Sequence, residues 1–487
     1  MAKLMNEGAV YPQARYETLE TVTAIGHASL ATGAWAHRHG IVGNRHFDRA
    51  SGKLVAPFSD ATHPVLGAAN DEGDVSPVNL LAETLSDRLR ASTGQRGKAV
   101  ALAGKPRSAI AMAGRLGDAW WFHHGVGGFV TGTYYKKEFP LWVQRFNEKK
   151  LADAAWGQQW TLSAPVKDYL GEDDRPFESE LFGLGRVFPH PLHGGLPSPG
   201  KASYEALGTS PFATELLVEF AKAAIEGEQL GRDDVPDLLS ISFSAVDKTY
   251  HLYGPTSWEY QDHLLRFDRA LGQLLAAAER AAGKGNVLVV LSGDHGGANI
   301  PEEWAAQGLE GLRVSPDQLK KELDAALEKQ FGAPGLVAAI EESDVYLDWK
   351  RLESRKLDVV AVRRAAAAWL SQRPELFAAA SRDALQLPSL EREAAHAYHP
   401  ERSGDVLFVL RPFKVLESWP RGTSHGQPWS YDADVPLVLW GRGVRTGHYG
   451  QRAQPIDLAP TVAALLELSA PASCEGRILF EAVTLTK

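Results

Sequence analysis

The sequence contains very little cysteine: Cys474 is the only one among 487 residues. A single cysteine cannot form an internal disulfide, and it excludes a zinc site built from several cysteines. The chain also has no run of eighteen apolar residues, so we expect no transmembrane helix. Its first residues lack the apolar stretch of a secretory signal peptide.

Basic runs and basic tails are absent as well. The 51 Lys and Arg residues are outnumbered by 60 Asp and Glu residues, which gives a formal net charge of −9. The field of the whole molecule therefore repels polyanions, and we expect neither a nucleic-acid partner nor a membrane partner. A site for a small anionic substrate would need local positive charge, which metal ions or a few fixed cations can supply.

Short apolar runs alternate along the chain with amphipathic segments. The runs are typical of buried parallel strands, and the segments have the three- and four-residue spacing of helices that cover a sheet. This alternation predicts an α/β fold with a central, mostly parallel sheet and helices on both faces. The expected strands are 99–103, 238–246, 287–291, 406–410 and 436–440, and the expected helices are 78–89, 212–225, 260–281 and 319–331.

Two long stretches do not fit the alternation. Residues 120–210 are rich in Trp, Gly and Pro, and residues 301–398 are mostly helical by pattern. Strands typical of the core resume after each stretch. We therefore expect a single domain over residues 1–487, with insertions at about 120–210 and 301–398.

Asp and His residues stand where expected strands end, which is the edge where open α/β sheets form sites. Asp247 and His251 follow one strand, and their i, i+4 spacing places them on one face of a helical turn. Asp294 and His295 follow another, and two glycines allow that strand to break. His425 lies in a Gly-Thr-Ser-His-Gly loop. Each motif alone is typical of a surface turn, but together two carboxylates and three imidazoles form a ligand set suited to zinc.

The segments SFSAVDKTYHLYGPTSWEYQDHLLRFD, LSGDHGG and TSHGQPWSYDADVPLVLWG resemble the metal-binding segments of the alkaline phosphatase superfamily. They are most similar to its type I phosphodiesterase and phosphate-monoester branch. Upstream, LETVTAIGHASLATGAWAHRHGIVGN resembles the nucleophile segment of that branch. The match places the nucleophile at Thr23, with His27, Gly33 and Asn44 in the corresponding positions. The resemblance covers nearly the whole chain.

The resemblance implies two zinc ions and a phosphothreonine intermediate. Zinc coordination would remove the proton of the threonine hydroxyl, which is otherwise a poor nucleophile. Thr23 would also begin a helix whose N-terminus favours a phosphoryl group, although a simple N-cap role is compatible with the same position. One zinc would be held by Asp247, His251 and His425, and the other by Asp294, His295, Thr23 and one further Asp.

Lys105 and Arg107 indicate which branch of the superfamily the chain resembles. They follow the strand 99–103 two residues apart, so on an extended chain they would share one face. The Arg fork and the Lys point charge suit phosphate oxygens, and the pair resembles the phosphate-contacting pair of the monoesterases, as Asn44 resembles their amide contact. We therefore expect a zinc-dependent phosphate monoester hydrolase acting on small molecules.

The segment that precedes Thr23 contains no Asp. In the family, the first core strand ends in an Asp that ligates the second zinc. We expect that the start of this chain is truncated, with loss of a signal peptide, of that strand and of its ligand, and that the enzyme is periplasmic or secreted. The chain as given would then bind the second zinc weakly and fold poorly. The carboxylates of Glu7, Glu17 and Glu20 are available, but none ends an apolar strand.

Two alternatives remain open at this point. A phosphodiesterase or nucleotide pyrophosphatase of the same superfamily would have identical metal ligands. An inactive metal-binding homologue would explain the absent Asp. A sulfatase needs a Cys or Ser nucleophile in a Cys/Ser-x-Pro-x-Arg setting, which Cys474 does not have.

Overall fold

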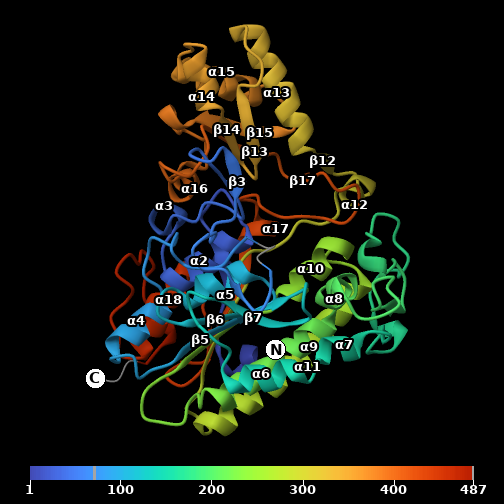
Figure 1. Ribbon diagram of the computed structural model, residues 1–487, viewed down its shortest axis with the longest axis vertical. Coiled ribbons are helices and arrows are strands. Elements are labelled where there is room, and N and C mark those ends of the chain that lie inside the picture. The colour runs from blue at the N-terminus through green and yellow to red at the C-terminus, as the bar shows by residue number, and fades with distance from the viewer. Residues whose placement is uncertain (70–72, 485–487) are drawn as a thin grey trace.

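The computed structural model describes residues 1–69 and 73–484 as an α/β structure (Figure 1). Its first core sheet has the strand order β10-β5-β6-β7-β4, in which β10, β5 and β6 are parallel, and β7 runs antiparallel to both of its neighbours, β6 and β4. The apolar segment AVALA makes β5 a strand that is buried on both faces, as helix-covered parallel strands are. The strands are β4 (Val65–Leu66), β5 (Ala99–Ala103), β6 (Asp118–His123), β7 (Gly128–Gly132) and β10 (Leu238–Ser242).

A second core sheet has the order β11-β18-β1-β19. Strand β18 runs antiparallel to both β11 and β1, so this half of the core is not parallel as expected. The strands are β1 (Ala9–Arg15), β11 (Leu288–Ser292), β18 (Asp434–Gly441) and β19 (Gly447–His448).

The strands β10 and β11 form the facing edges of these two sheets. Leu239 and Ile241 of β10 pack against the same apolar cluster as Val289 and Leu291 of β11. No strand among the described residues pairs with the outer edge of either one. Their side chains are consequently only half-buried, whereas those of β5 are fully buried. The core is therefore divided between these two strands.

Helices cover the core sheets. The long helices α9 and α11 pack together and, with β5, β6, β10 and β11, enclose the largest apolar cluster. Helix α2 packs on α5, close to the carboxyl ends of the strands. The helices around the core sheets are α2 (Thr23–Thr32), α5 (Pro106–Ala113), α9 (Pro211–Gly227), α10 (Ser244–Tyr253), α11 (Trp258–Ala282) and α18 (Leu458–Leu465).

The residues around 312–410 build a subdomain with its own core, at the top of Figure 1. Its sheet has the order β13-β14-β16-β15, and Leu323, Val345 and Phe408 are among its buried side chains. Its elements are α13 (Pro316–Phe331), β13 (Val337–Glu341), β14 (Asp344–Leu347), α14 (Trp349–Ser354), α15 (Val359–Ser371), β15 (Leu376–Ser381) and β16 (Val406–Leu410).

The remaining elements are short or peripheral. The other helices are α1 (Ala2–Glu7), α3 (Ala36–His39), α4 (Leu85–Ser92), α6 (Leu141–Glu148), α7 (Leu151–Ala155), α8 (Lys201–Gly208), α12 (Pro301–Ala306), α16 (Glu391–Ala397) and α17 (Ser430–Ala433). The other strands are β2 (His46–Asp48), β3 (Lys53–Val55), β8 (Gln159–Trp160), β9 (His190–Pro191), β12 (Leu312–Val314) and β17 (Lys414–Leu416). Within the described residues, no helix combines the length and the apolarity needed to cross a membrane.

Several boundaries differ from those expected. Strand β10 ends at Ser242 because α10 begins two residues later, and α4 begins at Leu85 rather than at 78. Strands β6 and β7 fall inside the stretch 120–210 but belong to the first core sheet. Strand β16 has the expected bounds but pairs antiparallel within the subdomain, so it is not a core strand that resumes after an insertion.

Candidate metal and phosphate site

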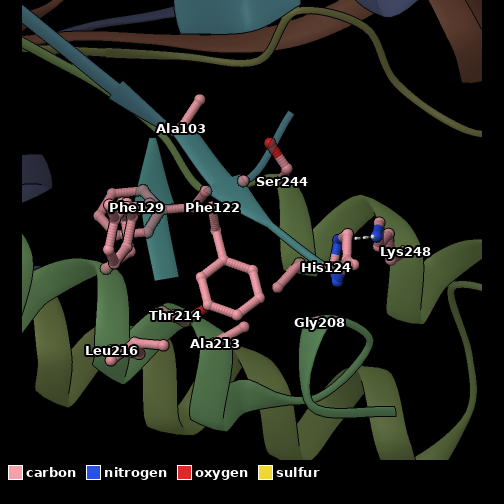
Figure 2. A pocket seen from close by; sticks show the side chains of 14 residues that line it. Ala103, Phe122, His124, Phe129, Gly208, Ala213, Thr214, Leu216, Ser244 and Lys248 are labelled. Carbon is pink, nitrogen blue, oxygen red and sulfur yellow. Dashed lines mark hydrogen bonds between the residues drawn. The ribbon is translucent and has the colours of Figure 1, made fainter. Parts of the chain in front are cut away.

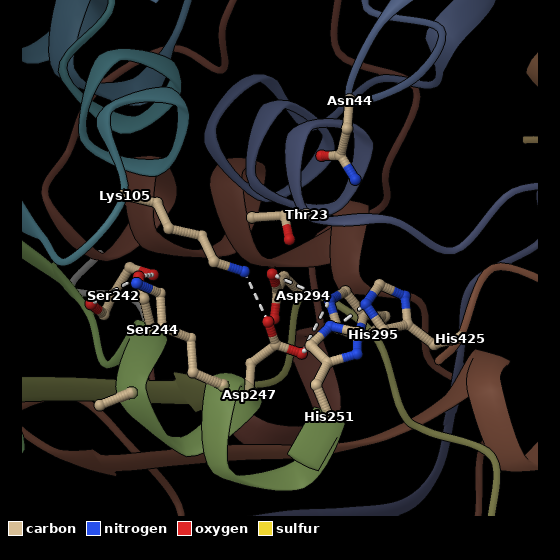
Figure 3. A network of polar contacts seen from close by, with 12 residues as sticks. Thr23, Asn44, Lys105, Ser242, Ser244, Asp247, His251, Asp294, His295 and His425 are labelled. Carbon is tan, nitrogen blue, oxygen red and sulfur yellow. Dashed lines mark hydrogen bonds and ion pairs between the residues drawn. The ribbon is translucent and has the colours of Figure 1, made fainter. Parts of the chain in front are cut away.

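Four side chains from three separate segments converge below the first turn of α2 (Figure 3). Asp247 lies in the first turn of α10, where its Oδ1 atom is 3.4 Å from the Nε2 atom of His251. The same oxygen lies 3.9 Å from the Nε2 atom of His295 and 3.6 Å from that of His425. The rings of His295 and His425 stack with their centroids 3.5 Å apart. The predicted ligands thus meet at the carboxyl ends of β10 and β11.

Backbone carbonyls hold all three imidazoles by their other ring nitrogen. His251 Nδ1 lies 2.9 Å from the Thr423 carbonyl oxygen, and His425 Nδ1 lies 2.7 Å from the Thr21 carbonyl oxygen. His295 Nδ1 lies 2.8 Å from the carbonyl oxygen of Gly296. A carbonyl can only accept, so each Nδ1 carries a proton, and each Nε2 is the ring nitrogen that faces Asp247. This is the arrangement by which proteins orient metal-binding histidines.

The polar atoms at the centre of this cluster lack partners of their own. Asp247 Oδ1 and His295 Nε2 are buried and make no hydrogen bond within the described chain. One ligand atom each from Asp247, His251 and His425 lies within 4.8 Å of the others. Buried, unpaired polar groups are costly unless something satisfies them, so the donor set fits a metal cation.

The charges around Asp247 favour its ionised form. Burial by itself would raise its pKa, but the Lys105 ammonium, 2.5 Å away, and His251 hold the pKa of Asp247 well below its usual value. Burial would likewise lower the pKa of His251, but the Asp247 carboxylate raises it overall. Burial and the neighbouring His295 lower the pKa of His425 well below its usual value. The cluster therefore presents an anionic oxygen at its centre and a neutral imidazole at His425.

Asp294 lies beside this cluster, nearer to α2. Its Oδ2 atom is 3.4 Å from His295 Nε2 and 3.2 Å from His27 Nδ1. The two segments approach closely because Gly26 has no side chain: a Cβ atom there would lie 2.0 Å from the Asp294 carbonyl oxygen. The pKa of Asp294 is lowered, because His295 and His27 outweigh the effect of burial. A second anionic oxygen therefore stands within reach of Thr23.

Thr23 is the first residue of α2, and its hydroxyl points toward Asp294 in Figure 3. It is buried, with 2% of its surface exposed. The residue that caps the helix is Val22, which has no capping side chain, so the N-cap interpretation of Thr23 is wrong. Asn44 caps this end instead, because its Oδ1 accepts a hydrogen bond of 3.1 Å from the Ala24 N–H group. Gly33 ends the same helix in a left-handed conformation.

Lys105 and Arg107 do not share one face of a strand as expected. Strand β5 ends at Ala103, Lys105 caps α5, and Arg107 lies inside that helix. Pro106 at the first helical position favours this early helix start. Lys105 reaches Asp247, whereas the charge of Arg107 partly offsets the effect of burial on Asp74, whose pKa is raised to about 6. The Nε atom of Arg107 is buried without a hydrogen-bond partner in the described chain.

The carboxylates that precede Thr23 are engaged away from the cluster. Glu7 accepts a hydrogen bond from Trp440. Glu17 pairs with Arg392 and Arg452. Glu20 accepts a hydrogen bond from the Ser343 N–H group in the subdomain. Within residues 1–69 and 73–484, no carboxylate takes the place of the further Asp that the resemblance implies for the second metal.

Two residues that hold the His425 loop carry no signal in the sequence. Asp432 Oδ2 accepts hydrogen bonds from the Gly426 and Gln427 N–H groups, at 3.1 Å and 2.9 Å. Tyr250 donates its hydroxyl to the Ser424 carbonyl oxygen, 2.6 Å away. Both residues lie inside the segments that resemble the family, but no spacing pattern marks their contacts. Only the folded chain brings them under the loop.

A small cavity lies beyond Lys248, on the other side of α10 (Figure 2). Phe122, Phe129 and Phe243 are among its lining residues, and its volume of about 20 Å³ is room for one water molecule. At its edge Lys248 donates to His124 Nε2, 2.8 Å away. Burial and that lysine lower the pKa of His124 to about 3, so the imidazole is a neutral acceptor. The cavity is too small to receive a substrate.

Comparison with known proteins agrees with this geometry. The model of the type I phosphodiesterase / nucleotide pyrophosphatase family matches residues 1–427. Alkaline phosphatase PafA of Elizabethkingia meningoseptica is 33% identical over 489 residues, which is 99% of this chain and 89% of that protein. Alkaline phosphatase PhoV of Synechococcus elongatus is 30% identical over 485 residues, 98% of this chain and 87% of PhoV. The crystal structure of wild-type PafA superposes with a TM-score of 0.92 at 32% identity, over 99% of this chain and 94% of that one.

Proposed function

We propose a mechanism for this chain, which belongs to the type I phosphodiesterase / nucleotide pyrophosphatase family and is a phosphate monoester hydrolase. Metal cofactors follow from its alkaline phosphatase relatives, and we propose that they are two zinc ions. The observation that carries the proposal is the convergence of the Asp247 carboxylate with the Nε2 atoms of His251, His295 and His425 below the start of α2. Carboxylate and imidazole ligands in a compact buried cluster suit zinc.

In this proposal Asp247, His251 and His425 hold one zinc ion, and Asp294, His295 and Thr23 contribute to the second. Bound zinc supplies Lewis acidity, which lowers the pKa of a coordinated hydroxyl and offsets charge on phosphoryl oxygens. The carbonyls that fix each Nδ1 keep the imidazoles oriented for this role. The missing carboxylate leaves the second set one ligand short.

Thr23 is the proposed nucleophile. Its oxygen attacks the phosphorus atom, the bond to the leaving alkoxide breaks, and a phosphothreonine forms while the hydroxyl proton of Thr23 ends on the released alcohol. Water then attacks the same phosphorus: its oxygen leaves with the inorganic phosphate, and one of its protons goes to the Thr23 oxygen. The position at the first turn of α2 places backbone N–H groups and the positive end of the helix dipole near the phosphoryl group.

Lys105, Arg107 and Asn44 would bind the non-reacting phosphate oxygens. A monoester dianion offers one more free oxygen than a diester, and therefore makes use of all three groups. Lys105 already lies 2.5 Å from Asp247, so it can serve both metal ligand and substrate. We propose that small-molecule monoesters are preferred over diesters. A diesterase remains the second candidate, because the metal ligands would be the same.

The arrangement of the chain supports a single catalytic domain, with the subdomain 312–410 as an insertion that contacts the site loops. By family likeness we further propose a periplasmic or secreted location. Neither statement alters the chemistry assigned to the site.

The test is to trap the intermediate. Zinc-loaded protein is mixed with a ³²P-labelled monoester, quenched in acid and analysed for labelled peptide. We expect label on the peptide that contains Thr23, and the variant Thr23→Ala should lose the label and on the order of 10⁶-fold of turnover, as removal of the nucleophilic serine does in a serine protease. Wild-type turnover by Thr23→Ala with unchanged zinc content would contradict the assignment.

A further inference from the structure

A hairpin of the subdomain reaches from outside the core to the loop that carries Asn44. Strands β13 and β14 pair with Glu341 opposite Asp344, so Glu342 and Ser343 form the tip. Glu342 adopts a φ of +51°, in the left-handed region that favours glycine. A Glu in this conformation is strained unless its surroundings hold it there, and such strain concentrates at functional positions. We therefore expect contacts of the Glu342 side chain to hold the tip in this conformation.

Glu342 makes one direct contact with the site loop. Its Oε1 atom accepts a hydrogen bond of 3.0 Å from the backbone N–H group of Asn44. The preceding residue, Gly43, makes room for the carboxyl group, since a Cβ atom there would lie 2.2 Å from Glu342 Oε2. The Glu342 side chain can therefore approach the loop this closely because residue 43 has no side chain.

The contact continues from the Asn44 backbone to the start of α2. Asn44 Oδ1 accepts from the Ala24 N–H group, which can only donate, so the amide NH₂ group must face the other way. Figure 3 shows the Asn44 side chain directed toward Thr23. Asn44 therefore connects Glu342 to the helix turn that carries the proposed nucleophile.

The same hairpin tip holds the other flank of Thr23. The Ser343 N–H group donates to Glu20 Oε1, 3.1 Å away, three residues before Thr23 in the sequence. Burial, with the charge of Glu341, raises the pKa of Glu342 to about 8. Burial also raises the pKa of Asp344 to about 7 and that of Glu20 well above its usual value. Neutral carboxyl groups can pack here without mutual repulsion, so the tip is held by hydrogen bonds.

We propose that Glu342 is a positioning residue for phosphate monoester hydrolysis, which acts by fixing the backbone of Asn44 so that the amide faces the phosphoryl group above Thr23. The inference rests on the substrate-binding role proposed for Asn44. It assigns to the subdomain a part in catalysis although no atom of Glu342 touches the proposed metal ligands or substrate.

The test compares three variants in the zinc-loaded full-length chain. Glu342→Ala removes the acceptor and should lower kcat/KM for a monoester about tenfold, as loss of a hydrogen bond to a positioned group does. Glu342→Gln keeps an acceptor and should restore activity to within about twofold of the wild type. The matched control is Glu341→Ala, which breaks the 2.8 Å ion pair with Arg45, a largely exposed side chain on the same loop, and should leave activity unchanged.

A double-mutant cycle with Asn44→Ala decides the mechanism. If Glu342 acts through Asn44, then Glu342→Ala should have no further effect in the Asn44→Ala background, and both single variants should reduce the monoester-to-diester ratio alike. Effects that multiply, or a Glu342→Ala loss that is equal for both substrates, would overturn the positioning role alone. Full activity of Asn44→Ala would overturn the role of Asn44 and the positioning role with it.

A second variant covers the case in which Glu342→Ala does not fold. Gly43→Ala leaves the hairpin intact but places a methyl group against the Glu342 carboxyl group, and Gly43 has no positive φ that alanine would strain. Gly43→Ala should also lower kcat/KM for a monoester about tenfold, and it should have no further effect in the Asn44→Ala background. Wild-type kinetics of a folded Gly43→Ala protein would overturn the proposal.

Discussion

Around Asp247, three imidazoles already direct their Nε2 atoms at one carboxylate oxygen, whereas around Asp294 only His295 does so. The other imidazole near Asp294, that of His27, approaches with Nδ1, which also lies 2.9 Å from the Thr23 carbonyl oxygen. The Asp247 side is therefore organised by the fold before any ligand binds. The Asp294 side has one such contact and depends on the first turn of α2.

The two proposed metal positions should therefore differ in their affinity for metal. Pre-orientation of ligands lowers the ordering cost of binding, so the Asp247 side should bind first. The carboxylates that precede Thr23 do not compensate, because Glu7, Glu17 and Glu20 are engaged elsewhere.

Among the metal ligands, removal of the Asp247 carboxylate should have the largest effect. Asp247→Ala leaves three imidazoles and Lys105 without their anionic partner, so we expect loss of the tightly bound metal and about a 10³-fold loss of kcat/KM, since a catalytic metal is worth several kcal/mol. Metal content by mass spectrometry and monoester kinetics measure both. Asp434→Ala, which breaks an ion pair with Arg15 on the surface, is the control. Retention of metal in Asp247→Ala would show that the cluster is not a metal site.

Zinc titration of the metal-free chain should resolve two affinities. We expect the second ion to bind about 10- to 100-fold more weakly than the first, or more, because a lost ligand should cost at least as much as a lost supporting group. Asp294→Ala should abolish only the weak phase, and His251→Ala should weaken the strong one. Calorimetry at fixed pH separates them. Two tight phases of equal affinity in this 487-residue chain would remove the contrast.

Substrate recognition should respond more moderately. Lys105→Ala and Arg107→Ala should each lower kcat/KM for monoesters about 10- to 100-fold, the value of a lost charge-assisted contact, and should affect diesters less. The control is Lys98→Ala, because the Lys98 side chain lies at the opposite end of β5 and donates only to the Gln229 carbonyl oxygen. Equal losses on both substrates would favour the diesterase alternative.

The smallest effect concerns the pH dependence of stability. Burial raises the pKa of Asp432 to about 8, so its neutral form is favoured in the folded state, and its contribution is lost as pH rises from about 4 to 8. The lowered pKa of Asp247 acts in the opposite sense and only at acid pH, where stability falls as the carboxylate is protonated. The contribution of Asp432 to the free energy of unfolding of the metal-free protein should therefore fall between pH 4.5 and 8, by at most about 1.4 kcal/mol per pH unit.

Asp432→Asn tests that assignment directly. The amide oxygen can still accept from the Gly426 and Gln427 N–H groups, but the side chain no longer titrates. We expect the Tm of this variant, relative to that of the wild type, to rise from pH 4.5 to pH 8, with little difference at pH 4.5. A Tm difference that does not change with pH would show that Asp432 does not carry this dependence.

The split core bears on the chain as a whole. Strands β10 and β11 share apolar neighbours on one face yet leave their facing edges unpaired in the described structure. Free, apolar strand edges favour aggregation. We therefore predict aggregation during refolding, measured by the yield of monomer.

Much of the site could be read from local patterns. The Asp247–His251 spacing predicted one helix face, and α10 carries both residues. The glycines after His295 and the apolar segment of β5 likewise predicted a broken strand end and a buried strand. Local patterns failed where one segment suits two conformations. Lys105 and Arg107 were expected at the end of a strand, but Pro106 begins a helix there.

The sequence by itself determined which side chains could bind metal and phosphate, because their chemistry and their positions at strand ends are local properties. Tertiary structure alone decided how they are oriented. The carbonyl that fixes His425 belongs to Thr21, 404 residues away, and the acceptor that fixes Asn44 belongs to Glu342, 298 residues away. No periodicity records such contacts, because they depend on which surfaces pack together after the chain has folded.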